Sequence, residues 1–233
     1  MDYKKIEKFW KSTANGHDRF STMLTNMDFA KFRHVSEQKK VFSYLNLDLN
    51  KMVLDLGCGP GRWTIPLSFY CKKVVAVDYI DEPDFWSLDN VEYHKQNILS
   101  FKTDEKFDII FLAGVLQYLD DTDVQKILEK CYNWLEEKGQ LIIISTVSLN
   151  EPFKRMDNNF EGYFRTINQY LKFIDKFDNY DYMDSHGLYL FGFNKYKMLD
   201  YVANSFLAKN FRVWYTKKFR EYPAIPIIFI CRK

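Results

Sequence analysis

Apolar residues in the middle of the chain gather in short runs that polar loops separate. The runs cover 52–54, 73–77, 107–112 and 140–147, and each has the composition of a buried parallel strand. A further strand is expected at 91–94, where apolar and polar residues are mixed. Between 123 and 135 the apolar residues recur at helical spacing, which predicts an amphipathic helix with Thr122 or Asp121 as its N-cap and Gly139 at its end. This alternation predicts an α/β fold with a doubly wound, mostly parallel sheet.

The two ends of the chain follow other patterns. Residues 1–20 and 28–46 carry apolar side chains at helical spacing and predict two helices before the sheet. Near the C-terminus, we expect a helix from Asn194 to about Lys209 and strands over 211–218 and 225–231. A connection this short between two strands requires them to be antiparallel.

Residues 148–192 interrupt the alternation of strands and helices. They are rich in Phe, Tyr, Asp and Asn, in a chain whose aromatic content is 18%. We expect an aromatic-rich insertion over the carboxyl edge of the sheet, between the fifth and sixth strands, with a helical part around 162–173.

Composition narrows the class of protein. The 233 residues suit one large domain, and the formal net charge of +2 gives no bulk attraction to nucleic acid or to a membrane. The four cysteines are far apart, so neither a metal site nor a disulfide framework is expected. Without a signal region or a run of about 18 apolar residues, the sequence favours a cytoplasmic protein with no membrane span.

The stretch from Met52 to Trp63 joins an apolar run to alternating glycines and then to a helix that we expect to begin at about Gly61. Asp55 ends the first strand and Asp78 ends the second, where a carboxylate can accept both hydroxyls of a ribose. A dinucleotide fold would need a glycine in place of Arg62, and Asp55 would repel a pyrophosphate. A ligand with a ribose, a cationic amine and no phosphate fits better, and S-adenosylmethionine has that description.

The segment VLDLGCGPGRW, at 53–63, resembles motif I of the class I S-adenosylmethionine-dependent methyltransferases, and VVAVDYID, at 74–81, resembles the segment that follows it. Residues 94–99, 107–121 and 134–145 resemble later segments of that family in the same order. The resemblance covers roughly 50–147. It implies a Rossmann-like sheet of strand order 3-2-1-4-5-7-6, with an antiparallel last strand, and S-adenosylmethionine as cofactor.

The resemblance also implies roles for individual residues. Asp78 would bind the ribose hydroxyls, Asp55 the amino group directly or through water, and Asn97 with the backbone of Ile98 the adenine. The expected cofactor set is completed by Gly57, Cys58, Gly59, Gly61, Tyr79, Ala113, Gln117 and Arg33. In this set the glycines allow close backbone approach, the 113–117 loop borders the methionine end, and Arg33 pairs with the methionine carboxylate.

We expect a single domain over 1–233 with four parts. These are a helical lid at 1–48, a cofactor-binding core at 49–147, a substrate-binding insertion at 148–192, and a C-terminal helix and hairpin at 193–233. The candidate general base is His186, and the candidate substrate residues are Tyr118, Tyr163 and Tyr189. Gln117 or Tyr118 could instead orient the substrate, which leaves the base unassigned.

The loop after the fourth strand bears on the methyl acceptor. It reads Leu112-Ala113-Gly114-Val115, whereas enzymes that methylate amino groups of adenine or glutamine carry an Asn/Asp-Pro-Pro-aromatic tetrad. Together with the lack of a basic stripe, this disfavours a nucleic-acid partner. An aromatic, hydroxyl-rich insertion favours O-methylation of a small metabolite or a saccharide. N-methylation of a small amine and a catalytically silent cofactor-binding subunit remain alternatives, and the oligomeric state stays open.

Overall fold

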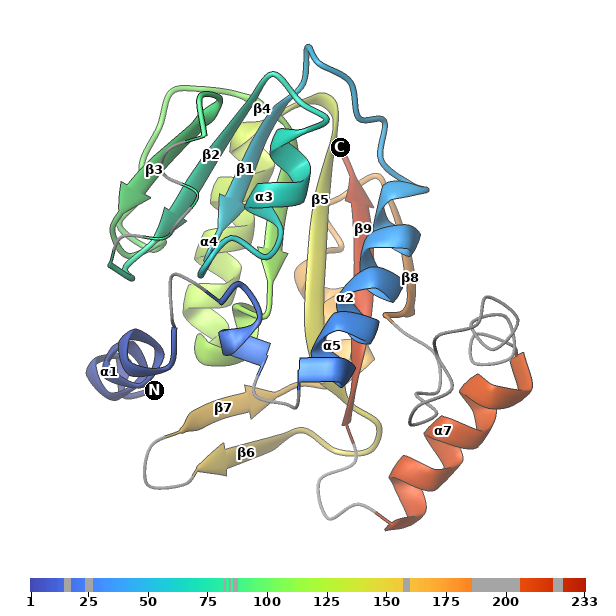
Figure 1. Cartoon of the computed structure of the whole chain (residues 1–233). Coiled ribbons are helices and arrows are strands. Elements are labelled where there is room, and N and C mark those ends of the chain that lie inside the picture. Colours follow the sequence, from blue (N-terminus) through green and yellow to red (C-terminus); the bar gives the residue numbers. More distant parts are fainter. Residues whose placement is uncertain are drawn as a thin grey trace.

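The computed structural model describes residues 1–14, 18–23, 27–81, 83, 85, 88–156, 160–185, 206–219 and 224–233. A sheet of seven strands in the order β3-β2-β1-β4-β5-β9-β8 forms its centre (Figure 1). The strands are β1 (Met52–Leu56), β2 (Lys73–Asp78), β3 (Val91–Lys95), β4 (Phe107–Ala113), β5 (Leu135–Ser148), β8 (Asn179–Asp184) and β9 (Ala224–Arg232). Among the described strands of this sheet, β9 runs antiparallel to β5 and β8, and the others all share one direction. This confirms the expected order, with β8 as the sixth strand of the sheet and β9 as the seventh.

Helices cover both faces of the sheet, because side chains alternate between the faces along each strand. On one face, Leu54 and Ile110 belong to a buried cluster with residues of α4 (Asp121–Trp134) and α5 (Ile167–Phe173). On the other face, Val53 and Ile109 pack with residues of α2 (Met27–Phe42) and α3 (Thr64–Ser68). Figure 1 shows α2 and α3 in front of the sheet and α4 behind it.

The boundaries around α4 differ from the prediction by a few residues. Its N-cap is Asp120, whose carboxylate accepts a hydrogen bond from the Asp123 N–H, and the helix ends at Trp134 rather than near Gly139. The chain enters β5 at the next residue, Leu135, which pairs with Phe107 of β4. The helix α3 begins at Thr64 rather than at about Gly61, because Gly61 is left-handed, and the chain turns after Ser68.

The predicted C-terminal hairpin is wrong. Residues over 211–218 belong to the helix α7 (Phe206–Phe219), and the partner of β9 is β8, which lies within the expected insertion. As an edge strand, β8 is mostly exposed and alternates polar residues with Tyr180 and Tyr182, so it lacks the apolar run of a buried strand. The helix expected to start at Asn194 begins outside the described residues.

The rest of the insertion lies at the carboxyl edge of the parallel strands. It contains an antiparallel hairpin of β6 (Phe153–Met156) and β7 (Glu161–Phe164), followed by α5. Thr166 caps α5 in a reciprocal pair of hydrogen bonds with Gln169, which confirms a helix in this region. Figure 1 shows the hairpin below the ends of β1 and β4, and α1 (Tyr3–Thr13) beside it.

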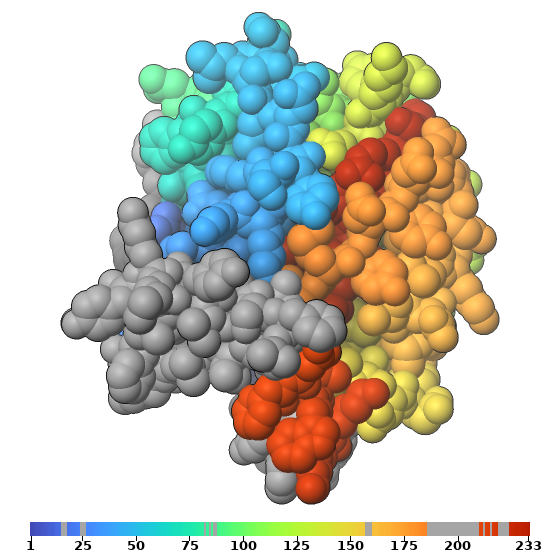
Figure 2. All heavy atoms as spheres, turned by 90° about the vertical axis from the view of Figure 1, so that its right-hand side faces the viewer, coloured from blue at the N-terminus to red at the C-terminus, as the bar shows by residue number. Residues whose placement is uncertain are grey.

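Both expected N-terminal helices are present as α1 and α2, with a short 3-10 turn, η1 (Ser21–Met23), between them. Seen from the β8 side, α2 and the segment that carries α5 and β8 form neighbouring parts of the surface (Figure 2). Lys40 of α2 donates a hydrogen bond to the carbonyl of Asp184 there. None of the described helices combines the length and apolar character that crossing a bilayer requires.

Candidate functional site

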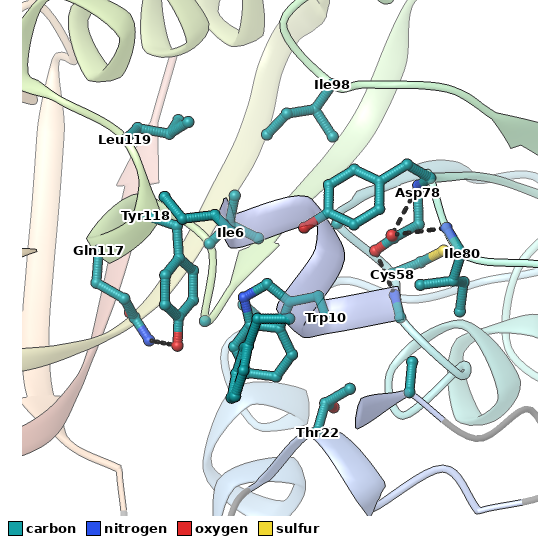
Figure 3. A pocket seen from close by; sticks show the side chains of 18 of the residues that line it. Ile6, Trp10, Thr22, Cys58, Asp78, Ile80, Ile98, Gln117, Tyr118 and Leu119 are labelled. Carbon is teal, nitrogen blue, oxygen red and sulfur yellow. Dashed lines mark hydrogen bonds between the residues drawn. The ribbon is translucent and has the colours of Figure 1, made fainter. Parts of the chain in front are cut away.

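A cavity of about 620 Å³ opens at the carboxyl ends of β1, β2 and β4, beneath α1. This is the edge at which doubly wound sheets bind ligands, and the volume suits a ligand of cofactor size. Its walls come from distant parts of the chain, with Ile6 and Trp10 of α1 facing Ile98 and Tyr118 across the space (Figure 3).

The glycine loop after β1 forms one wall. Gly57 and Gly59 have φ angles of 73° and 53°, which side chains rarely tolerate. A Cβ on Gly57 would lie 2.4 Å from Val115 of the loop after β4. Glycine at this position therefore lets two ligand-facing loops pack directly together.

Asp78 holds a fixed carboxylate at the tip of β2. It accepts hydrogen bonds from the N–H groups of Gly59 at 2.9 Å, Tyr79 at 2.7 Å and Ile80 at 3.3 Å, and Figure 3 shows this cradle. Burial raises the pKa of Asp78, while the three N–H groups act against that rise. The backbone thus aims one carboxylate into the cavity.

Asp55 is a second buried carboxylate, at the end of β1. Thr64 donates a hydrogen bond to it at 2.7 Å. Burial raises the pKa of Asp55 to about 6, against the opposing effects of the Thr64 hydrogen bond and the Arg62 charge. A cationic ligand group beside it would compensate this desolvation.

Two arginines share one carboxylate at the α2 wall. Arg33 Nε and Arg62 Nη1 each lie 2.6 Å from an oxygen of Glu37, whose side chain is fully buried. Burial raises the pKa of Glu37, but the two guanidinium charges outweigh it and hold the pKa well below its usual value. The trio carries one surplus positive charge, and both arginines line the cavity.

Beyond β3, Asn97 and Ile98 line the cavity as expected. The Asn97 side-chain oxygen accepts a hydrogen bond from the Leu99 N–H at 2.9 Å, so it also shapes the turn. Its amide nitrogen and the Ile98 backbone are the groups left for a ligand.

Gln117 and Tyr118 lie after β4 in the short helix η3 (Leu116–Tyr118). Gln117 Nε2 donates to the Tyr118 hydroxyl at 3.2 Å, and the Gln117 oxygen accepts from Ser145 of β5, also at 3.2 Å. Burial raises the pKa of Tyr118 well above its ordinary value. The phenol therefore stays protonated at neutral pH.

The helix α1 is held over the cavity. The Tyr3 hydroxyl bonds to Asp123 at 2.5 Å and to Asp120 at 3.1 Å, at the N-terminus of α4. Trp10 meets the ring of Tyr118 edge-to-face at 5.1 Å. These contacts hold the N-terminal helix at the cavity.

The cavity collects most of the expected site residues. Those lining it are Arg33, Asp55, Gly57, Cys58, Gly59, Asp78, Tyr79, Asn97, Ile98, Ala113, Gln117 and Tyr118. Gly61 lies outside the lining, and a Cβ there would clash with Phe85 at 2.3 Å. Tyr163 also lies outside it, with its ring under the Arg165 guanidinium. His186 and Tyr189 are outside the described residues.

Sequence reasoning did not assign Trp10, Arg62, Arg155 and Phe160, which also line the cavity. For the Glu37 trio a signal existed, because Arg33 and Glu37 are spaced i,i+4 on a predicted helix. No local signal marks Arg155 or Phe160, since only the fold brings the β6–β7 hairpin to the site.

Comparisons of sequence agree with this geometry. A family model described as a methyltransferase domain matches residues 53–139. The chain is 27% identical over 154 residues to phosphoethanolamine N-methyltransferase 1 of Caenorhabditis elegans, covering 63% of this chain and 32% of that protein. It is 26% identical over 158 residues to ubiquinone biosynthesis O-methyltransferase of Rickettsia felis, covering 64% and 62%. The chain thus spans about a third of the first relative's length.

A solved structure with the same fold is phosphoethanolamine N-methyltransferase 1 of Haemonchus contortus, in complex with phosphoethanolamine and S-adenosylhomocysteine. The TM-score is 0.67 at 17% identity, covering 98% of this chain and 48% of that one. The domain match falls on the strands and loops that build the cavity, and the cavity's carboxylates suit a ribose and an amine. Residues 53–139 therefore form part of a methyltransferase domain with the class I, Rossmann-like fold, and the cofactor of such domains is S-adenosylmethionine.

Proposed function

We propose that this chain transfers a methyl group from S-adenosylmethionine to an oxygen of a small metabolite or saccharide. One observation carries the proposal: a single cavity joins a carboxylate-lined side, at Asp55 and Asp78, to an aromatic side formed by Trp10, Tyr118 and Phe160. Rings of this kind stack on the apolar faces of sugars and planar metabolites. The first side suits the cofactor and the second suits an acceptor.

The charged groups match the methionine end of the cofactor. Asp55 would hold the ammonium group, and the surplus positive charge shared by Arg33, Arg62 and Glu37 would hold the carboxylate. Asp78, fixed by three N–H groups, would accept the ribose hydroxyls. Asn97 and Ile98 would bind the adenine, with Cys58 and Tyr79 completing the wall.

When bound, the cofactor supplies an electrophilic methyl group on a positively charged sulfur. The chain's own task is then to align the acceptor and to exclude water, which supplies most of the rate in such a displacement. Among the described residues that line the cavity there is no histidine, and Tyr118 keeps its proton. We therefore assign catalysis to alignment by Trp10, Gln117 and Tyr118, and His186 stays a sequence-based candidate for a base.

N-methylation of a small amine is the second candidate. The specific observation in its favour is the similarity to phosphoethanolamine N-methyltransferases in sequence and in fold. The transfer step needs only a lone pair on the acceptor, so the same cavity would serve an amine nitrogen.

The test uses methyl-deuterated S-adenosylmethionine, the purified chain and a metabolite extract, with mass spectrometry to find labelled products. We expect labelled small molecules, and fragmentation of each product distinguishes an O-methyl from an N-methyl group. Asp78→Ala is the inactive control. Binding of S-adenosylhomocysteine with no labelled product in any extract would instead favour a silent cofactor-binding subunit.

A further inference from the structure

A chain of hydrogen bonds runs from the interior of the molecule to the acceptor side of the cavity. It begins at Tyr170, which is fully buried. The side chain of Arg165 is fully buried as well. Arg165 donates to the carbonyls of Leu116 at 2.9 Å and Leu119 at 2.8 Å, and to Asp121 at 2.8 Å. The arginine therefore braces the loop that carries Gln117 and Tyr118.

The direction of the hydrogen bonds follows from Gln117, whose side-chain oxygen can only accept and whose nitrogen can only donate. Ser145 donates its single proton to the Gln117 oxygen, so Tyr170 donates to Ser145 Oγ, 2.5 Å away. The Gln117 nitrogen donates to the Tyr118 hydroxyl.

The last hydroxyl of the chain consequently faces the cavity as a donor. The Tyr118 oxygen accepts from Gln117, so its own proton is directed away from Gln117, and Tyr118 lines the cavity beside Trp10 (Figure 3). Burial raises the pKa of Tyr118 well above its ordinary value, so this proton is kept at neutral pH. A ligand group with a lone pair can therefore accept this proton.

A positive charge that the cofactor does not use lies in the same cavity. Arg155 lines the cavity, and its charge favours a negative charge at the Tyr118 hydroxyl. The Arg155 guanidinium lies 5.4 Å from the centre of the Phe160 ring, which meets the Tyr118 ring edge-to-face at 5.8 Å. An anionic oxygen at Tyr118 would gain a charged hydrogen bond and a favourable potential, whereas a cation would lose both.

We propose that Tyr118 determines acceptor specificity by donating a hydrogen bond to a carboxylate or phosphate oxygen of the methyl acceptor. The inference rests on the proposed function, because it assigns the acceptor side of that cavity. It narrows the acceptor to small molecules that carry such an anionic group.

The experiment measures binding of matched probes to the chain saturated with S-adenosylhomocysteine, by calorimetry. Benzoate and benzamide have nearly the same shape and differ in charge; phosphoethanolamine and ethanolamine differ by the phosphate. We expect the anionic member of at least one pair to bind more tightly, and which pair responds separates a carboxylate from a phosphate acceptor. Equal binding within both pairs would overturn the inference, whereas failure to bind S-adenosylhomocysteine would overturn the proposed function instead.

Variants test the role of the hydroxyl. Tyr118→Phe keeps the ring packing and removes the donor, so we expect it to lower the anion preference roughly tenfold or more, as loss of a charged hydrogen bond does. Tyr170 lies outside the cavity lining. Tyr170→Phe removes the hydroxyl that donates to Ser145 and allows the hydrogen bonds to reverse their direction, so we expect a partial loss of the preference. Both should bind S-adenosylhomocysteine as the unaltered chain does.

The matched controls are Tyr44→Phe, which removes an exposed tyrosine hydroxyl, and Lys172→Gln, which removes an exposed positive charge. Neither residue lines the cavity, so both should keep the full anion preference. A preference retained in Tyr118→Phe would remove Tyr118 from acceptor recognition. A preference retained in full by Tyr170→Phe would overturn the assigned direction of the hydrogen bonds.

Discussion

Asp78 and Asp55 face the same cavity but are held in different ways. Three backbone N–H groups fix Asp78, so its position follows from the path of the chain. A single hydroxyl, from Thr64, fixes Asp55, and burial raises its pKa to about 6. The first carboxylate is therefore set up for neutral hydroxyls and the second for a cation.

Asp78→Ala should weaken binding of S-adenosylhomocysteine by roughly 1.5–3 kcal/mol, the range for hydrogen bonds to a charged partner. The fold should survive, because the carboxylate sits at a strand tip outside the apolar clusters. Calorimetry measures the affinity and thermal unfolding measures the fold. An unchanged affinity combined with a large loss of melting temperature would make Asp78 structural.

The raised pKa of Asp55 predicts opposite effects of pH on stability and on binding. The folded chain holds the proton more tightly than the unfolded chain, since the pKa rises from 3.8 to about 6. Its contribution to stability is thus complete below pH 3.8 and is lost as the pH rises through about 6; in full it is at most about 3 kcal/mol. Binding of the cofactor ammonium needs the ionised form and should weaken as the pH falls below about 6.

His34 does not obscure this window, because burial lowers its pKa to about 4. Chemical unfolding and calorimetry between pH 5 and 7 would measure both trends, and Asp55→Asn should flatten both. Identical pH profiles of the unaltered chain and Asp55→Asn would exclude Asp55 as the titrating group.

At the scale of elements, α1 at the cavity depends most on its contacts with the rest of the domain. Ile6 is the one buried residue of α1. The helix contacts the rest of the domain through Tyr3, Phe9 and Trp10. A short helix is marginal alone, so these contacts decide how long it stays in place.

Tyr3→Phe should loosen α1 without unfolding the sheet, because it removes the hydroxyl that bonds Asp120 and Asp123. We expect faster amide hydrogen exchange in α1 and a Kd for S-adenosylhomocysteine raised roughly threefold to tenfold, the worth of one or two hydrogen bonds. Exchange in β1 and β4 should not change. In the matched control, Tyr44→Phe, the residue does not line the cavity; an effect of equal size there would contradict the assignment.

The elements also differ in whether the sequence alone predicts them. The buried strands β1, β2, β4 and β5 were predictable, because each needs a continuous apolar run. The edge strand β8 was not predictable, because it pairs with β9 on one side and its tyrosines and aspartates face solvent, so no apolar run is needed. The apolar residues of 211–218 read as a strand but form part of α7, since alternation over so few residues does not distinguish the two.

For the whole molecule, the sheet is what makes the site predictable in part. Residues at strand ends, such as Asp55, Asp78 and Ala113, must meet at one edge whatever the loops do. Residues such as Trp10 and Arg155 reach the cavity through a helix and a hairpin whose docking only tertiary packing decides. The part of the cavity that strand ends form could therefore be predicted, whereas the part that α1 and the hairpin form could not.

Saturation with S-adenosylhomocysteine should stabilise the whole fold. At a concentration one hundred times the Kd, binding adds about 2.7 kcal/mol to the free energy of unfolding, or roughly 5–10 °C in Tm for a chain of this size. NAD should give no shift, because Asp55 would repel its pyrophosphate and Arg62 stands where a dinucleotide site needs a glycine. Differential scanning fluorimetry compares the two; a shift with NAD alone would contradict the cofactor assignment.

The position of β9 between β5 and β8 has a consequence for the order of folding. During synthesis β8 exists before β9, but among the described strands the partner of β8 in the sheet is β9 alone. Until residues 224–232 emerge, β5 presents a bare apolar edge, and bare edges invite pairing with other chains. The ribosome-bound chain therefore passes through a stage in which the first five strands can assemble while their sheet is still open on one side, and a chaperone that shields β5 would act at that stage.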